Sequence, residues 1–137
     1  MDYEQFKIKE YRHWSLQLRE NQSYLGWCLL WAKRDELSDL MDITADEERE
    51  LFAIARDVKK ALTELFHPDM FNWAALGNKT PHLHLQIIPR YREPREFAGA
   101  RFEDGRWGQN YSPYKYDLKM SDEIMVVLRE MIKNKLS

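Results

Sequence analysis

The sequence is poor in several features, and each scarcity excludes a class of protein. It contains one cysteine, Cys28, so no disulfide can form within the chain. Its apolar runs stay well below the ~18 residues of a membrane span, and the acidic residues 1–4 lack the apolar segment of a signal peptide. The formal net charge of -2 lacks the basic excess of nucleic-acid-binding proteins. We therefore expect a cytoplasmic protein that binds neither membranes nor nucleic acids.

The amino-acid composition is that of one folded domain. Of the 137 residues, 44% are hydrophobic and 13% aromatic, which is enough apolar surface for a substantial core. Charged residues make up 32% of the chain and provide a polar surface, so extensive disorder is not expected. We expect a single domain over residues 1–137, with Cys28 buried as a packing residue.

The spacing of apolar residues predicts the first elements. Apolar and polar side chains alternate in part over residues 11–19 and 24–31, which predicts a β-hairpin. From Thr44 onward the apolar residues recur three and four apart, which predicts an amphipathic helix. Thr44 and Glu47 form a capping box at its start, and the pair His67-Pro68 ends it.

The second half of the chain combines short strands, a long loop and a final helix. Residues 71–76 predict a strand, and residues 77–81 predict the turn that follows it. Residues 93–120 predict a long loop, and Ser121 starts a helix over residues 121–136. About five antiparallel strands and two helices, one of them long, make an α+β domain. The helices should cover one face of the sheet and leave the other face open for a ligand.

The run from His82 to Arg90 carries the clearest chemical signal. His82, His84 and Gln86 occupy alternating positions of an apolar strand, so they share one face of it. The opposite face then holds the apolar side chains Leu83, Leu85 and Ile87. One face of the strand is typical of a core and the other of a site.

Three interpretations of the polar face stay open. The imidazoles form structural hydrogen bonds, or chelate a metal ion as a His-x-His pair, or carry out nucleophilic chemistry on phosphorus. A metal ion needs further ligands, whereas Gln86 is a weak one and the remaining histidines are His13 and His67. Two imidazoles and an amide in register favour the nucleophilic interpretation, with no metal bound.

The run His82-Leu83-His84-Leu85-Gln86-Ile87-Ile88 resembles the histidine-triad (HIT) motif, His-φ-His-φ-His-φ-φ, with Gln86 in place of its last histidine. The Pro89-Arg90 pair that follows also matches. Three further segments resemble the family's strand into a basic turn, its long-helix start, and the strand and turn before the triad. These segments are residues 29–34, 43–48 and 71–78. The similarity extends over roughly residues 11–92.

The resemblance implies a homodimer that binds a nucleotide or dinucleoside polyphosphate on the open sheet face. It implies hydrolysis or transfer of a nucleoside monophosphate group at the α-phosphate. By position, His84 would be the nucleophile that forms a nucleotidyl-histidine, and His82 would orient the site. No cofactor would be required, although a divalent cation can accompany the nucleotide. The nucleotide contacts that the resemblance implies are Asn72, Gly77, Asn78 and Arg90.

Gln86 departs from the family pattern and affects the expected reaction. A glutamine amide donates and accepts hydrogen bonds, but it cannot relay a proton by titration. The His-x-His-x-Gln pattern resembles that of nucleotidyltransferases and dinucleoside-polyphosphate phosphorylases, which favours transfer over rapid hydrolysis. The alternative is a catalytically slow nucleotide-binding protein that signals through a partner. A second departure is Asp35, which stands where many family members carry another histidine.

Side chains outside the motif have two interpretations each. Lys33, Arg34 and Lys79 raise the local positive potential for a polyphosphate, or they are solvated surface charges. Three aromatic residues of the long loop close over a base by stacking, or they pack that segment. They are Trp107, Tyr111 and Tyr114.

Overall fold

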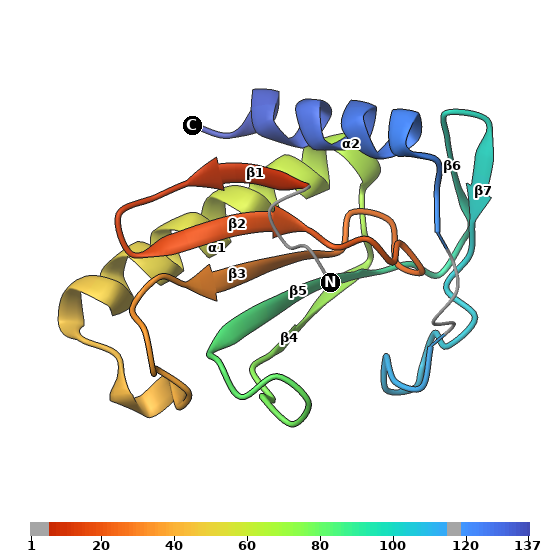
Figure 1. Cartoon of the computed structure of the whole chain (residues 1–137). Coiled ribbons are helices and arrows are strands. Elements are labelled where there is room, and N and C mark those ends of the chain that lie inside the picture. The colour runs from red at the N-terminus through yellow and green to blue at the C-terminus, as the bar shows by residue number, and fades with distance from the viewer. Residues whose placement is uncertain (1–5, 115–118) are drawn as a thin grey trace.

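Five strands form an antiparallel sheet in the order β1-β2-β3-β5-β4 (Figure 1). The computed structural model describes residues 6–114 and 119–137. The sheet strands are β1 (Lys7–Glu10), β2 (Trp14–Leu18), β3 (Cys28–Ala32), β4 (Met70–Ala74) and β5 (His84–Arg90). The other elements are a 3-10 helix (Leu40–Asp42), helices α1 (Ala45–Phe66) and α2 (Asp122–Lys135), and a separate hairpin of β6 (Arg95–Phe97) and β7 (Ala100–Phe102). This arrangement confirms the predicted α+β fold.

Helix α1 begins and ends where the sequence predicts. The Thr44 hydroxyl accepts a hydrogen bond from the Glu47 backbone N–H, and the Glu47 carboxylate accepts one from the Thr44 backbone N–H. Such a capping box satisfies two of the N–H groups that a helix start leaves without partners. At the other end His67 adopts a left-handed conformation, φ 50°, and Pro68 follows. The helix therefore stops before β4 begins.

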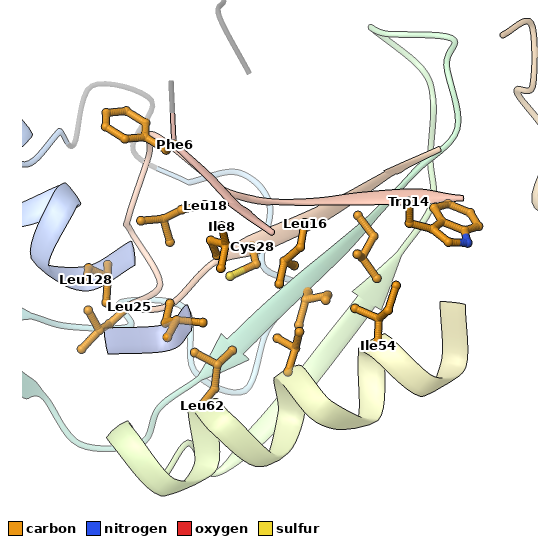
Figure 2. Close-up of a cluster of buried hydrophobic side chains, with 14 of the residues drawn as sticks. Phe6, Ile8, Trp14, Leu16, Leu18, Leu25, Cys28, Ile54, Leu62 and Leu128 are labelled. Atoms are coloured by element: carbon orange, nitrogen blue, oxygen red, sulfur yellow. The ribbon is translucent and has the colours of Figure 1, made fainter. Parts of the chain in front are cut away.

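The hydrophobic core lies between the sheet and the two helices (Figure 2). Leu16 and Cys28 from the sheet face Ile54 and Leu62 of α1, and Leu128 of α2 closes the cluster. All five are at most 3% exposed. Burial of a leucine or isoleucine side chain stabilises a fold by roughly 1.5–3 kcal/mol. Because the helices cover only this face, the opposite face of the sheet remains for a site.

The histidine strand begins two residues later than the sequence predicts. The Leu83 backbone N–H donates to the Leu37 carbonyl at 2.8 Å and not to β3, although the Leu83 carbonyl accepts from the Ala32 backbone N–H at 3.1 Å. Regular pairing starts at His84, opposite Trp31. His82 therefore precedes β5. Strand β4 likewise ends at Ala74 and not at residue 76.

Two further elements lie outside the predicted pattern. β1 pairs with β2 at the edge of the sheet, and its one buried residue, Ile8, is 2% exposed and belongs to the core. The predicted loop 93–120 contains the β6–β7 hairpin, whose turn places Ala98 and Gly99 at positive φ. An alanine is not a usual residue for such a turn, so the hairpin gave no sequence signal. In the described ranges, no helix is long and apolar enough to cross a membrane.

Candidate functional site

The sheet face that the helices leave uncovered carries the candidate site, and we call it the site face. On β5 it presents His84, Gln86 and Ile88, while Leu85 and Ile87 contact the core. The cross-strand pairs with β3 place Trp31 opposite His84, and Leu29 opposite Gln86. The predicted alternation of polar and apolar faces is therefore present from His84 onward.

The geometry of His84 defines which ring nitrogen is available. Its Nδ1 lies 2.8 Å from the backbone carbonyl oxygen of His82. A carbonyl oxygen only accepts hydrogen bonds, so Nδ1 carries the proton. In the neutral ring Nε2 then has a free lone pair, which is the state that a nucleophile requires. The ring also stacks on Trp31, with the two centroids 5.6 Å apart.

His82 has the opposite arrangement. Its Nε2 lies 2.5 Å from the backbone carbonyl oxygen of Ala32, so Nε2 donates. Its ring stacks on Trp31 with centroids 4.4 Å apart. His82 thus supports the backbone whose carbonyl orients His84. Within residues 6–114 and 119–137, no three His, Cys, Asp or Glu side chains gather as metal ligands.

Gln86 is oriented by a residue that the sequence did not assign to the site. The indole Nε1–H of Trp27 donates to the Gln86 Oε1 at 2.7 Å. The carbonyl end of the amide is therefore occupied by Trp27, and the amide NH2 is the end available to a ligand. No sequence pattern connects Trp27 with Gln86, because the two residues are 59 positions apart.

Trp27 is held in place by charged and aromatic neighbours. The Arg19 guanidinium carbon lies 4.0 Å from the ring centroid of Trp27, and three tyrosine rings meet Trp27 edge-on. These rings are Tyr24, Tyr111 and Tyr114, with centroids 5.4, 6.1 and 4.9 Å from that of Trp27. Tyr111 and Tyr114 therefore pack the segment 107–114 onto the site face, the second of their two interpretations.

Arg90 is 2% exposed and links the site face to that segment. Its guanidinium donates to both carboxylate oxygens of Asp104 at 2.6 and 3.1 Å, and to Asn72 Oδ1 at 2.8 Å. Two backbone carbonyls, those of Arg106 and Gln109, accept the remaining bonds. All five N–H donors of Arg90 thus have partners. A direct contact between Arg90 and a nucleotide stays a prediction, and it would require one of these bonds to open.

The other predicted side chains are dispersed around the site. Gly77 has a φ of 67° and begins the turn that leads to His82, and Asn78 is exposed in that turn. Lys33 lies 3.2 Å from a Glu10 carboxylate oxygen. Thus Gly77 and Asn78 lie next to the histidines in the chain, whereas Lys33 is already paired.

Arg34 serves the helix and not the site. It donates to both carboxylate oxygens of Glu47, at 3.0 and 3.1 Å. These hydrogen bonds lower the pKa of Glu47 to about 2. The pair therefore anchors the chain after β3 to the start of α1.

Comparisons with known proteins show which family and which folds the chain is similar to. The family model of the HIT domain matches residues 4–93. A histidine triad protein from Bradyrhizobium japonicum has a TM-score of 0.79 at 21% identity, over 96% of this chain and 90% of that one. One from Sinorhizobium meliloti has 0.81 at 18%, over 96% and 89%. A diadenosine triphosphate hydrolase from Plasmodium falciparum has 0.66 at 16%, over 95% and 75%. No curated protein matches the sequence.

Proposed function

The chain belongs to the HIT domain family, and from this premise we propose that it is a nucleotide hydrolase or nucleotidyltransferase that forms a covalent intermediate on His84. Its substrate is a nucleotide or a dinucleoside polyphosphate, attacked at the α-phosphate. The structurally similar diadenosine triphosphate hydrolase from Plasmodium falciparum supports this substrate class. The proposal requires no cofactor, although a divalent cation can accompany the substrate.

One observation carries the proposal, namely the hydrogen bond from His84 Nδ1 to the His82 carbonyl. It holds the proton on Nδ1 and leaves the Nε2 lone pair to attack phosphorus. In the first step Nε2 bonds to the α-phosphorus, the bond to the bridging oxygen breaks, and the leaving phosphate or nucleoside polyphosphate takes up a proton from water. In the second step water or another acceptor attacks the same phosphorus and loses a proton, and the phosphorus–nitrogen bond breaks.

Neighbouring donors stabilise the negative charge in both steps. The Gln86 amide NH2 faces the site because Trp27 occupies its Oε1. The backbone N–H groups of the turn at Gly77 and Asn78 are further candidates for phosphate oxygens. None of these donors titrates near neutral pH, so none supplies a proton to the leaving group as a histidine would. This favours an intermediate that persists long enough to be passed to another acceptor.

The test is a search for the intermediate. The protein is incubated with a dinucleoside polyphosphate labelled at the α-phosphate, denatured, and analysed for protein-bound label. We expect an acid-labile, alkali-stable adduct that is absent in His84→Asn. His67→Asn is the matched control, because it removes an imidazole outside the site at a left-handed position that asparagine tolerates.

Two outcomes contradict the proposal. If the native protein gives neither adduct nor turnover but binds the nucleotide, the slow nucleotide-binding alternative replaces it. If His84→Asn still forms the adduct, another side chain is the nucleophile. The first outcome has a structural basis in Gln86, since its amide cannot donate a proton by titration.

We also propose that the chain is a cytoplasmic homodimer. β4 lies at an edge of the sheet, so one side of its backbone has no sheet partner among residues 6–114 and 119–137. Beside it, a groove of about 710 Å³ runs between β4 and α1. Phe52 and Trp73 line this groove and are 50% and 43% exposed. A second copy of this edge and groove would cover both features.

A further inference from the structure

A cavity of about 920 Å³ lies between β4, the end of β5 and the segment 107–112. This volume is within the range of small-molecule sites. The site-facing side chains of β4, Asn72 and Ala74, line it, and Trp107 and Gln109 contribute from the segment 107–112. None of these four residues takes part in the covalent chemistry proposed for His84.

The pairing of β4 with β5 locates the cavity relative to His84. Ala74 lies opposite Gln86, Asn72 opposite Ile88, and Met70 opposite Arg90. All three β4 residues line the cavity. The cavity therefore begins one strand away from Gln86 and runs along the sheet, away from His84. Gln86 to Arg90 spans about 13 Å at roughly 3.3 Å per residue.

The cavity is lined by apolar and aromatic side chains together with amides, and its charge is neutralised. Arg90 is the one cation among the described lining residues, and Asp104 neutralises it while all five of its N–H donors are occupied. The side-chain amide of Gln109 is exposed, and the NH2 of Asn72 remains available beside its bonded Oδ1. Amides next to an aromatic ring suit a nucleobase and ribose, whereas a phosphate requires cations or free backbone donors.

The wall of the cavity is attached to the sheet before any ligand binds. Arg90 holds the carbonyls of Arg106 and Gln109 at 2.7 and 3.0 Å. The Tyr24 hydroxyl donates to the Tyr111 carbonyl at 2.5 Å. The cavity is thus preformed, so the protein loses less conformational entropy when a ligand binds.

We propose that this cavity binds the nucleoside of the leaving half of the substrate. The inference rests on the proposed function, because it takes the α-phosphate at His84 as its starting point. A leaving group that departs past the Gln86 amide passes Ala74 and enters the cavity, where Trp107 stacks on its base. The favoured substrate is then a dinucleoside polyphosphate, and a nucleoside triphosphate leaves the cavity empty.

The kinetic test compares a dinucleoside polyphosphate with the corresponding nucleoside triphosphate. Loss of a base–aromatic stack lowers affinity by roughly tenfold. The test quantity is the ratio of kcat/KM for the dinucleotide to kcat/KM for the triphosphate. We expect Trp107→Ala to lower this ratio roughly tenfold and Gln109→Ala to lower it less. Glu103→Ala, exposed just before this segment and outside the cavity, should keep the native ratio. An unchanged ratio in Trp107→Ala and Gln109→Ala overturns the proposal.

A binding test separates this inference from the covalent chemistry. In His84→Asn, which cannot form the adduct, free nucleosides are titrated while the indole N–H signals of the tryptophans are followed by NMR. We expect the Trp107 signal to shift with adenosine, guanosine, cytidine or uridine. If the protein forms the His84 adduct but no nucleoside shifts the Trp107 signal, the cavity assignment fails and the proposed function stands. A Trp107 shift without any adduct supports the nucleoside site and contradicts the covalent mechanism.

Discussion

At the scale of single residues, His82, His84 and Gln86 each have one polar side-chain atom occupied by a neighbour. His82 Nε2 donates to the Ala32 carbonyl, His84 Nδ1 donates to the His82 carbonyl, and Gln86 Oε1 accepts from Trp27. The atom that remains on each side chain is therefore the one available to a substrate. Two backbone carbonyls and one indole determine the chemistry of three side chains.

The orientation of Gln86 gives a prediction at this scale. Trp27→Phe keeps an aromatic ring but removes the indole N–H, so the Gln86 amide is free to turn its oxygen toward the phosphate. We expect kcat for nucleotide turnover to fall about tenfold, since an amide flip costs roughly 1–1.5 kcal/mol, with a smaller change in KM.

The control for this prediction is Trp14→Phe. Trp14 is also fully buried and donates its indole N–H, at 2.9 Å, to the Glu47 carbonyl on the core side of the sheet. The Trp14→Phe substitution should lower the stability of the fold but leave kcat unchanged. Equal effects of Trp14→Phe and Trp27→Phe on kcat would show that Trp27 acts through the fold and not through Gln86.

At the scale of elements, the start of α1 joins three parts of the chain. Glu47 caps the helix with Thr44, binds Arg34 from the segment after β3, and offers its carbonyl to Trp14 of β2. Its side chain is 4% exposed, so a carboxylate there requires these partners. The helix is thus held against the strand that precedes the site.

Glu47→Gln tests this junction. The pKa of Glu47 is lowered to about 2, first by its hydrogen bonds with Arg34. A depressed carboxyl pKa stabilises the fold above the unfolded value of ~4.3, and this contribution is lost as pH falls toward 2. We expect Glu47→Gln to lower the free energy of unfolding by about 1–3 kcal/mol at pH 7.

Urea denaturation at pH 7, 5 and 3 measures this effect. The difference between native protein and Glu47→Gln should be nearly constant from pH 7 to 5 and shrink by pH 3. Asp46→Asn serves as the control, because the Asp46–Arg49 pair is exposed on both sides and such pairs contribute little. A difference that stays constant down to pH 3 would contradict the role given to the Glu47 charge.

At the scale of the whole molecule, two regions flank the core. The segment 104–114 lies over one end of the site face through the buried Arg90–Asp104 pair and the rings around Trp27. On the helix side of the sheet, the β4 edge and the groove between β4 and α1 expose apolar side chains to solvent. The first region completes the cavity within one chain, and the second is the surface proposed for a second copy.

Charge in the groove gives the prediction at this scale. Trp73→Lys places an ammonium on the proposed dimer surface, so we expect a homodimer of the native chain to become a monomer in sedimentation-velocity experiments. Val127→Lys is the matched control, since Val127 is an apolar residue of α2 that is 49% exposed and lies outside the groove. A native monomer, or a Trp73→Lys dimer as stable as the native one, would contradict the assembly.

The sequence by itself determined the features that depend on neighbours close in the chain. The three- and four-residue spacing after Thr44 and its capping box predicted α1, and the alternation of His84, Leu85 and Gln86 predicted which side chains face the site. Ser121 likewise marked the start of α2. Helical and strand periods are local properties, so a linear pattern is sufficient to recognise them.

Only the tertiary structure decided which partners these side chains have. His82 and Ala32 are 50 positions apart, Trp27 and Gln86 are 59 apart, and Arg90 and Asp104 are 14 apart. Such pairs form because folding removes polar groups from water, and each buried donor or acceptor must then find a partner in space. The sequence therefore identified the imidazoles and the amide, and the fold selected which atom of each is bonded within the protein.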